Sequence, residues 1–307
     1  MATLLTGAGY IGAALLRRLS ERPVVVLENF FSTPRDAVEA ALPHGVSLIE
    51  GDVAEPGDVQ HAFDALGRVA EPTVVFHLAA QPSAAIAGRE PSLTERSNLV
   101  GARVVLQAAR ERNARVVFGG SFRVYGDDLV GDVVDEDAPY GRVGDLSHLS
   151  KVYVEQLARM VGVRFVSVRL GVTYGLSPIM KATPAFMTVP NLFCQRAAGG
   201  EVLQVLEDRP MAFIHVDDAV EALLRAAALE GADWQAVNAA PEIATIGQVA
   251  RTVERLMRRR GLSARTLGTT ASEATFEVRS RLALQPRHSL ESGLDDVLDY
   301  FCRLGRA

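Results

Sequence analysis

The chain has 307 residues, of which 48% are hydrophobic and 22% charged, and its formal net charge is −5. These values are typical of a globular protein with a large core, and the negative charge does not favour binding to nucleic acid or an anionic membrane. Two cysteines, Cys194 and Cys302, are too few for a disulfide framework, and no cluster of cysteine and histidine has the spacing of a metal site. We therefore expect a protein without a metal. Because neither a signal peptide nor a membrane-spanning run is visible, we also expect it to be cytoplasmic.

The first predicted element is a short apolar strand that ends at Thr6 and leads into a glycine-rich turn. Glycines at positions 7, 9 and 12 match the pattern G-x-G-x-x-G, and residues 13–19 are predicted to be helical. The first glycine permits a sharp turn, the second a close approach to a pyrophosphate, and the third close packing of helix on strand. The helix N-terminus offers its free N–H groups to the phosphates. We therefore predict a dinucleotide site that includes Gly7, Gly9, Tyr10, Ile11 and Gly12.

The next apolar run, at residues 24–27, ends in an acid, Glu28, at the distance of about 20 residues that a dinucleotide-binding unit requires. A carboxylate at this position accepts hydrogen bonds from ribose hydroxyls and repels a 2′-phosphate, so it favours NAD over NADP. The alternative is an acid at a strand end that contacts only solvent.

Short apolar runs alternate with amphipathic helical segments along the rest of the first half. Runs of β-branched residues without polar alternation are typical of strands buried on both faces. The alternation with helices predicts the fold class, an α/β protein with a doubly wound parallel Rossmann sheet. The strands are expected at residues 46–50, 73–78, 115–118 and 163–168, and the helices at residues 58–66, 94–112 and 147–161.

From Gly171 onward, prolines and paired glycines interrupt the chain, and helices are expected at residues 219–228 and 246–260. We predict an NAD-binding Rossmann domain over residues 1–170. A smaller substrate-binding lobe follows over residues 171–307 and interleaves with the sheet near residues 213–217.

Several motifs, taken in chain order, resemble those of one known family. Similarity is found to an H-L-A-A strand at residues 75–80, to S-S-S-x-x-V-Y-G at 118–126, to R-x-x-N-x-Y-G at 169–175, to F-I-H-V-D-D at 213–218 and to a closing helix at 284–300. Together with the glycine loop, these motifs resemble those of the extended short-chain dehydrogenase/reductase family. In the loop, Thr6 occupies the position of the first glycine of the family pattern. Within the family, the chain is most similar to NAD-dependent nucleotide-sugar epimerases and dehydratases.

The resemblance implies cofactor contacts beyond the glycine loop. The adenine-binding aspartate of the family corresponds to Asp52, and its helix asparagine to Asn98. The expected NAD contacts outside the loop are Glu28, Asn29, Asp52, Val53, Leu78, Ala79, Ala80, Asn98 and Lys151. The expected substrate contacts are Ser83, Val172, Asn191 and Arg209.

The resemblance also implies the catalytic groups and brings out one departure. The catalytic Ser/Thr of the family corresponds to Ser121, and the lysine of its Y-x-x-x-K motif to Lys151, but Ser147 stands in place of the tyrosine. In the family, the lysine lowers the pKa of the tyrosine, which removes a proton from a sugar hydroxyl while hydride passes to NAD. A serine hydroxyl cannot replace the phenol without another base, because its pKa is too high.

The nearest candidate base is His148, three residues before Lys151 and near the same helix face. An ordinary histidine pKa of about 6.5 suits acid–base chemistry near neutral pH, and the alternative is a capping or surface histidine. Asp145 and Tyr140 precede the helix and are further candidates, although Asp145 also suits an N-cap and Tyr140 packing over the cleft. Tyr153 falls on another face and is expected at an interface or in the core.

Two positions that the family uses for its substrate have changed. The asparagine of the R-x-x-N-x-Y-G motif corresponds to Val172, and the arginine before F-I-H-V-D-D corresponds to Met211. Arg209, Arg265 or Arg279 is the candidate to supply the missing charge.

These inferences favour an NAD-dependent nucleotide-sugar epimerase or dehydratase with an atypical acid/base. The alternatives are a non-catalytic, regulatory NAD-binding protein of the same fold and an enzyme of the fold that acts on a non-sugar substrate. Family members commonly dimerise through a four-helix bundle, which implies a homodimer through helices 94–112 and 147–161. The second helix carries an apolar stripe, whose alternative role is to face its own sheet: Leu149, Val152, Tyr153, Gln156, Leu157 and Met160.

Overall fold

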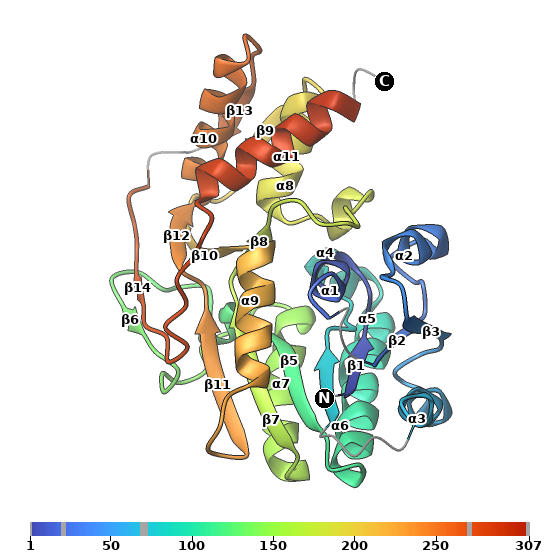
Figure 1. Cartoon of the computed structure of the whole chain (residues 1–307). Helices are drawn as coiled ribbons and strands as arrows, with labels where there is room; N and C mark the ends of the chain where they lie inside the picture. Colours follow the sequence, from blue (N-terminus) through green and yellow to red (C-terminus); the bar gives the residue numbers. More distant parts are fainter. Residues whose placement is uncertain (1, 20–22, 68–72, 269–271, 305–307) are drawn as a thin grey trace.

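The computed structural model describes residues 2–19, 23–67, 73–268 and 272–304, and within these residues the chain is built around one large parallel sheet (Figure 1). Neighbouring strands of this sheet are all paired in parallel, in the order β3-β2-β1-β4-β5-β7-β11. Their side chains are mostly buried on both faces, as the apolar runs predict. The strands are β1 (Ala2–Thr6), β2 (Val24–Glu28), β3 (Val46–Glu50), β4 (Thr73–His77), β5 (Arg115–Ser121), β7 (Arg164–Leu170) and β11 (Trp234–Ala239).

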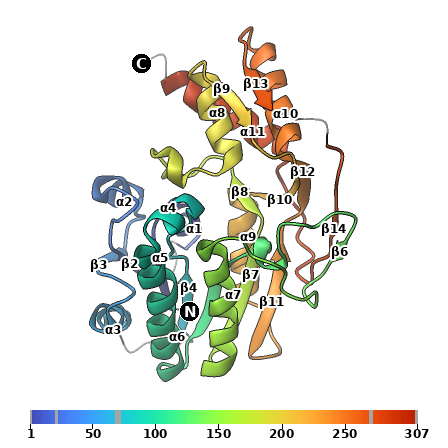
Figure 2. The ribbon, with the colours of Figure 1, turned by 180° about the vertical axis from the view of Figure 1, so that it is seen from behind.

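Helices cover both faces of the sheet, as the predicted doubly wound fold requires. On one face, α1 (Tyr10–Leu16) and α9 (Val216–Ala227) contribute to one apolar core. On the other, α3 (Pro56–Ala65), α6 (Gly101–Glu111) and α7 (Leu146–Val161) enclose a second core, and α6 and α7 come to the front in Figure 2. The predicted Rossmann class is therefore confirmed.

The segments between β2 and α6 shape the carboxyl edge of the sheet. Helix α2 (Arg35–Ala41) follows β2, while α4 (Ala84–Arg89) and α5 (Pro91–Thr94) follow β4. A π-helix, η1 (Glu95–Val100), then runs directly into α6, so the predicted helix 94–112 begins with a wider turn. A 3₁₀ turn, η2 (Phe122–Tyr125), follows β5.

A smaller lobe lies beyond the carboxyl ends of the large sheet (Figure 1). Its three-stranded sheet has β10 in the centre, antiparallel to β12 and parallel to β8. Two further parallel pairs, β9 with β13 and β6 with β14, complete the described strands. The elements are β6 (Val133–Val134), β8 (Val172–Tyr174), η3 (Pro184–Phe186), α8 (Val189–Ala198), β9 (Val202–Val205), β10 (Pro210–His215), β12 (Glu242–Thr245), α10 (Ile246–Arg259), β13 (Arg265–Gly268), β14 (Glu277–Val278) and α11 (Leu290–Leu304).

The chain returns to the large sheet later than the sequence indicated. Residues 213–215 belong to β10 of the small sheet, whereas α9 packs on the large sheet and β11 pairs with β7 along its edge. The expectation of interleaving near 213–217 is therefore corrected to residues 216–239. The segment Trp234–Ala239 lacked a long apolar run, and it is placed in the sheet by its pairing with β7. Among the described helices, none combines the length and the apolar character needed to cross a bilayer.

Candidate dinucleotide and substrate site

A cavity of about 660 Å³ lies where the large sheet meets the small lobe. This position, outside the carboxyl ends of parallel strands, is where open α/β sheets bind ligands. The further candidates Tyr140, Asp145, Arg265 and Arg279 do not line this cavity. The expected cofactor, substrate and catalytic residues line it with the exception of Asn98: Gly7, Gly9, Tyr10, Ile11, Gly12, Glu28, Asn29, Asp52, Val53, Leu78, Ala79, Ala80, Ser83, Ser121, Ser147, His148, Lys151, Val172, Asn191 and Arg209.

The glycine loop between β1 and α1 fits a dinucleotide. Gly7 adopts a φ of +87°, which favours glycine, and a Cβ there would lie 2.6 Å from the backbone nitrogen of Ala79. A Cβ on Gly12 would collide with the carbonyl oxygen of Gly7. Gly9 is the N-cap of α1 and borders the cavity. The loop thus presents bare backbone and a helix N-terminus to the space that a pyrophosphate would occupy.

Glu28 braces this loop as well as lining the cavity. Its Oε2 accepts a hydrogen bond from Ala8 N at 2.7 Å, and its Oε1 accepts one from Phe30 N at 2.9 Å. The residue is 8% exposed, so the alternative of an acid that contacts only solvent is wrong. A carboxylate fixed at the end of β2 suits the recognition of a ribose diol.

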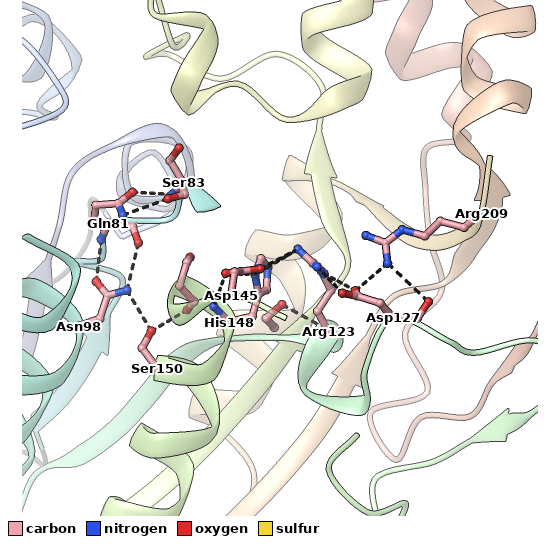
Figure 3. A network of polar contacts seen from close by, with 11 residues as sticks. Gln81, Ser83, Asn98, Arg123, Asp127, Asp145, His148, Ser150 and Arg209 are labelled. Carbon is pink, nitrogen blue, oxygen red and sulfur yellow. Dashed lines mark hydrogen bonds and ion pairs between the residues drawn. The ribbon is translucent and has the colours of Figure 1, made fainter. Parts of the chain in front are cut away.

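Asn98 is the exception among the predicted site residues. It is buried in η1 behind the cavity and does not line it. Its Oδ1 accepts from Gln81 N at 2.7 Å, while its Nδ2 donates to Gln81 O and to Ser150 Oγ, each at 3.0 Å (Figure 3). Ser150 in turn donates to the carbonyl of Ser147. Asn98 therefore positions the loop after β4 and the first turn of α7, a correction to the expected direct contact.

Lys151 and Ser147 lie one turn apart on α7, and both border the cavity. Lys151 Nζ donates to the carbonyl oxygen of Gly119 at 2.8 Å and lies 4.7 Å from the ring centre of Phe118. Ser121, at the end of β5, accepts a hydrogen bond from Arg123 N. The Ser147 side chain is buried.

The pKa of Lys151 makes its charge sensitive to mildly alkaline pH. Burial lowers this pKa from 10.5 to about 8, so the ammonium is charged at pH 7 and loses its proton as the pH rises through 8. In the role that the family resemblance implies, the charged lysine would attract ribose and substrate oxygens, so we expect kcat/KM to fall above about pH 8. A pH–rate profile measures this limb, and a flat profile up to pH 10 would contradict it.

His148 forms a dyad with the aspartate that caps its helix. Asp145 Oδ1 accepts from His148 N at 3.0 Å, as an N-cap, and His148 Nδ1 lies 2.8 Å from Asp145 Oδ2. Burial by itself would raise the pKa of Asp145, but the hydrogen bonds from His148 and the charge of Arg123 outweigh it and lower that pKa to about 2. An ionised Asp145 therefore holds Nδ1 of a half-buried imidazole that borders the cavity.

A chain of charges that sequence reasoning missed extends from this dyad (Figure 3). Arg123 pairs with Asp127 through two hydrogen bonds of 2.7 Å, and Arg209 Nη1 lies 3.0 Å from Asp127 Oδ1. Arg123 Nη1 lies 3.1 Å from His148 Nδ1 and 3.3 Å from Nε2. In this chain the charges of Arg123 and Arg209 alternate with those of Asp145 and Asp127, which largely balances them.

The remaining candidate site residues lie outside the lining of the cavity. Tyr140 donates to Glu155 Oε2 at 2.8 Å and does not line the cavity, so its role as a displaced phenol is not supported. Arg265 and Arg279 also lie outside the cavity lining, and Arg279 pairs with Glu277 on the surface. Tyr153 is exposed.

The predicted substrate residues come from both lobes. Asn191 is buried in α8, where its Oδ1 accepts from Gly175 N and its Nδ2 donates to Tyr10 OH at 3.2 Å. Ser83 caps α4 by accepting from Ile86 N. Val172 adds an apolar side chain to the lining of the cavity.

Lys181 is a further cavity residue that the sequence motifs did not indicate. It follows β8 in the small lobe, and its Nζ lies 3.2 Å from Ser32 Oγ and 3.4 Å from Thr33 Oγ1, beyond the end of β2. One signal was available: the chain contains only two lysines among its 32 lysines and arginines, Lys151 and Lys181. Both line this cavity.

The fold also gathers three potential metal ligands away from the cavity. Ligand atoms of His215, Asp218 and His288 lie within 4.8 Å of one another. The two imidazole rings stack with centroids 3.9 Å apart, and Asp218 accepts hydrogen bonds from Arg287 N and His288 N. These contacts assign the group a role in holding the segment before α11 to the start of α9.

Comparison with known proteins places the chain in a family. The model of the NAD dependent epimerase/dehydratase family matches residues 3–240. UDP-glucuronic acid decarboxylase 5 of Arabidopsis thaliana is 27% identical over 267 residues, which cover 82% of this chain and 73% of that protein. UDP-N-acetyl-alpha-D-glucosaminuronate decarboxylase of Bacillus cytotoxicus is 28% identical over 261 residues, covering 81% and 78%.

Similarity to a solved structure extends over nearly the whole chain. UDP-glucose 4-epimerase of Thermus thermophilus, crystallised as a complex with NAD, is 25% identical and superposes with a TM-score of 0.80, covering 98% of this chain and 99% of that one. The family, the fold class and the NAD cofactor predicted from the sequence are thereby confirmed. The chain belongs to the NAD dependent epimerase/dehydratase family.

Proposed function

We propose that this protein acts on a sugar linked to a nucleoside diphosphate and oxidises a ring carbon of that sugar. The observation that carries the proposal is the convergence, in one cavity, of the glycine loop, Lys151, Ser121 and His148, whose Nδ1 is held by Asp145. The named relatives act on UDP-linked sugars or their uronic acids, which makes uridine the first nucleotide to test.

In this proposal the side chains divide the work between binding and proton transfer. NAD, when bound, supplies the hydride acceptor. Lys151 binds hydroxyl groups near the reacting carbon, and Ser121 positions the hydroxyl that loses its proton. His148 accepts that proton on Nε2, which also lies 3.3 Å from Arg123 Nη1, and later returns it, while Asp145 holds Nδ1. Ser147 leaves space and takes no proton itself.

The test is spectroscopic and distinguishes the proposal from a non-catalytic NAD-binding protein. Purified protein with its cofactor is mixed with UDP-, dTDP-, GDP- and CDP-sugars, and NADH absorbance and sugar products are followed. We expect a transient NADH signal and a new sugar with at least one substrate. Bound NAD without any signal or product across the panel would favour the regulatory alternative, and a signal only with non-sugar carbonyl or alcohol substrates would favour the other enzyme.

We also propose a homodimer formed through η1, α6 and α7, in the cytoplasm. Leu149, Tyr153 and Met160 are exposed on α7, so these residues do not face the chain's own sheet. Such an apolar strip suits a second copy of the same helices. Both cysteines are free thiols, as is usual in a reducing compartment.

Replacing Tyr153 by glutamate is expected to convert the dimer to a monomer, because the charge would be buried at the interface. Light scattering coupled to size exclusion measures the mass. The control is Leu206→Glu, an apolar side chain that is 87% exposed outside these helices. A wild-type monomer, or equal masses for the two variants, would contradict the proposed interface.

A further inference from the structure

Lys181 brings a positive charge from the small lobe to the part of the large sheet that binds NAD. A Cβ placed on Gly9 would lie 3.2 Å from Lys181 Nζ, so the ammonium group stands directly over the second glycine of the loop. This glycine is where the backbone approaches the pyrophosphate of a dinucleotide. The ammonium also donates to Ser32 and Thr33, which follow β2. It therefore contacts both segments that hold the adenosine half of the cofactor.

The charge of Lys181 has no carboxylate partner among the described residues. No ion pair within that part of the chain includes it, although Glu28 is near enough to influence it. The Glu28 carboxylate is already engaged by Ala8 N and Phe30 N. Burial lowers the pKa of Lys181 as well. A largely enclosed ammonium group that bonds only two hydroxyls costs folding free energy, and a bound anion would offset that cost.

The rarity of lysine in this chain supports a specific role for Lys181. The protein uses arginine almost everywhere that a basic residue stands, and its two lysines both border one cavity. A lysine ammonium is a compact point charge on a flexible stem, whereas a guanidinium is a wide planar fork. The space between Gly9, Ser32 and Thr33 fits the compact group, with Nζ 5.8 Å from the ring centre of Phe186.

We propose that Lys181 binds the pyrophosphate of NAD and so joins the small lobe to the cofactor. The proposal rests on the NAD site and does not depend on the nucleotide-sugar reaction. The adenosine 2′-position is a less suitable target, because the Glu28 carboxylate would repel a phosphate there. On binding, the ammonium exchanges its hydroxyl partners, wholly or in part, for phosphate oxygens, which form stronger charge-assisted hydrogen bonds.

The test compares Lys181→Met with wild type by calorimetric titration of the 307-residue chain, without any sugar. We expect affinity for NAD and for ADP-ribose to fall about 10- to 100-fold, the range for loss of a hydrogen bond to a charged group. Affinity for adenosine is expected to stay unchanged, because adenosine lacks the pyrophosphate. Lys181→Arg should recover part of the loss. Arg303→Met, which removes one exposed charge from α11, controls for net charge and should bind like wild type.

Thermal unfolding and NADP binding provide two further tests of the proposal. Without ligand, Lys181→Met should unfold at the same or a higher temperature than wild type, because it removes a charge without a carboxylate partner. Equal NAD affinities for wild type and Lys181→Met would overturn the proposal. So would a selective loss of NADP binding, since the lysine would then serve a 2′-phosphate. If Lys181→Met unfolds, Lys181→Gln provides the same titrations with a polar side chain of similar reach.

Discussion

Replacing His148 by alanine is expected to lower kcat about 10²- to 10⁴-fold while NAD binding stays within about twofold of wild type, the range for loss of a general acid–base. The physical reason is that the imidazole borders the cavity on the same helix as Lys151 and is held by an ionised Asp145. Single-turnover NADH formation with an accepted nucleotide sugar measures the step directly.

The controls separate proton transfer from structural support. His61→Ala removes an exposed histidine from α3 and should leave kcat unchanged. Asp145→Asn should lower kcat less than His148→Ala does, because the imidazole stays in place and only the anionic partner of Nδ1 is lost. A His148→Ala enzyme with wild-type kcat would show that another group moves the proton.

Replacing Arg169 by methionine is expected to reduce the free energy of unfolding by about 3–5 kcal/mol, the range for breaking a buried ion pair. The Arg169 side chain is 3% exposed and that of Glu155 is fully buried, and the two groups are joined at 2.7 Å and 3.1 Å. Ser167 and Tyr140 also donate to the Glu155 carboxylate. Without Arg169, this carboxylate would remain buried next to neutral groups only.

Chemical denaturation of the apoprotein measures the loss. The control is Arg281→Met, which breaks a surface ion pair with Asp137 and should cost less than about 1 kcal/mol. Adding Glu155→Gln to Arg169→Met should recover part of the stability, because the uncompensated charge is removed. A loss below about 1 kcal/mol for Arg169→Met would mean that water reaches Glu155.

Features with a local physical cause were predictable from the sequence. The turn at Gly7 and the close packing at Gly12 depend on the absence of a side chain, so the pattern of glycines is sufficient to recognise them. The central strands are recognisable as β-branched runs, because burial on both faces leaves no room for polar alternation. Asp145 as an N-cap follows from its position before an amphipathic helix.

Features that depend on distant partners were not predictable in this way. Tyr140 donates a hydrogen bond to Glu155, and Asn98 donates one to the carbonyl of Gln81 behind the cavity. The helical periodicity of the sequence does not predict such partners. Strand β11 joins the sheet through its pairing with β7 and not through a recognisable apolar run.

The sequence by itself determined the family, the parallel sheet and the NAD cofactor, since each follows from residue types at short spacing. Only the tertiary structure decided which charges extend from His148. Arg123, Asp127 and Arg209 meet because a turn after β5 approaches the edge of the small lobe. Lys181 reaches Ser32 across about half the chain because the two lobes pack over one cavity. Such contacts arise from packing between elements, which spacing along the chain does not encode.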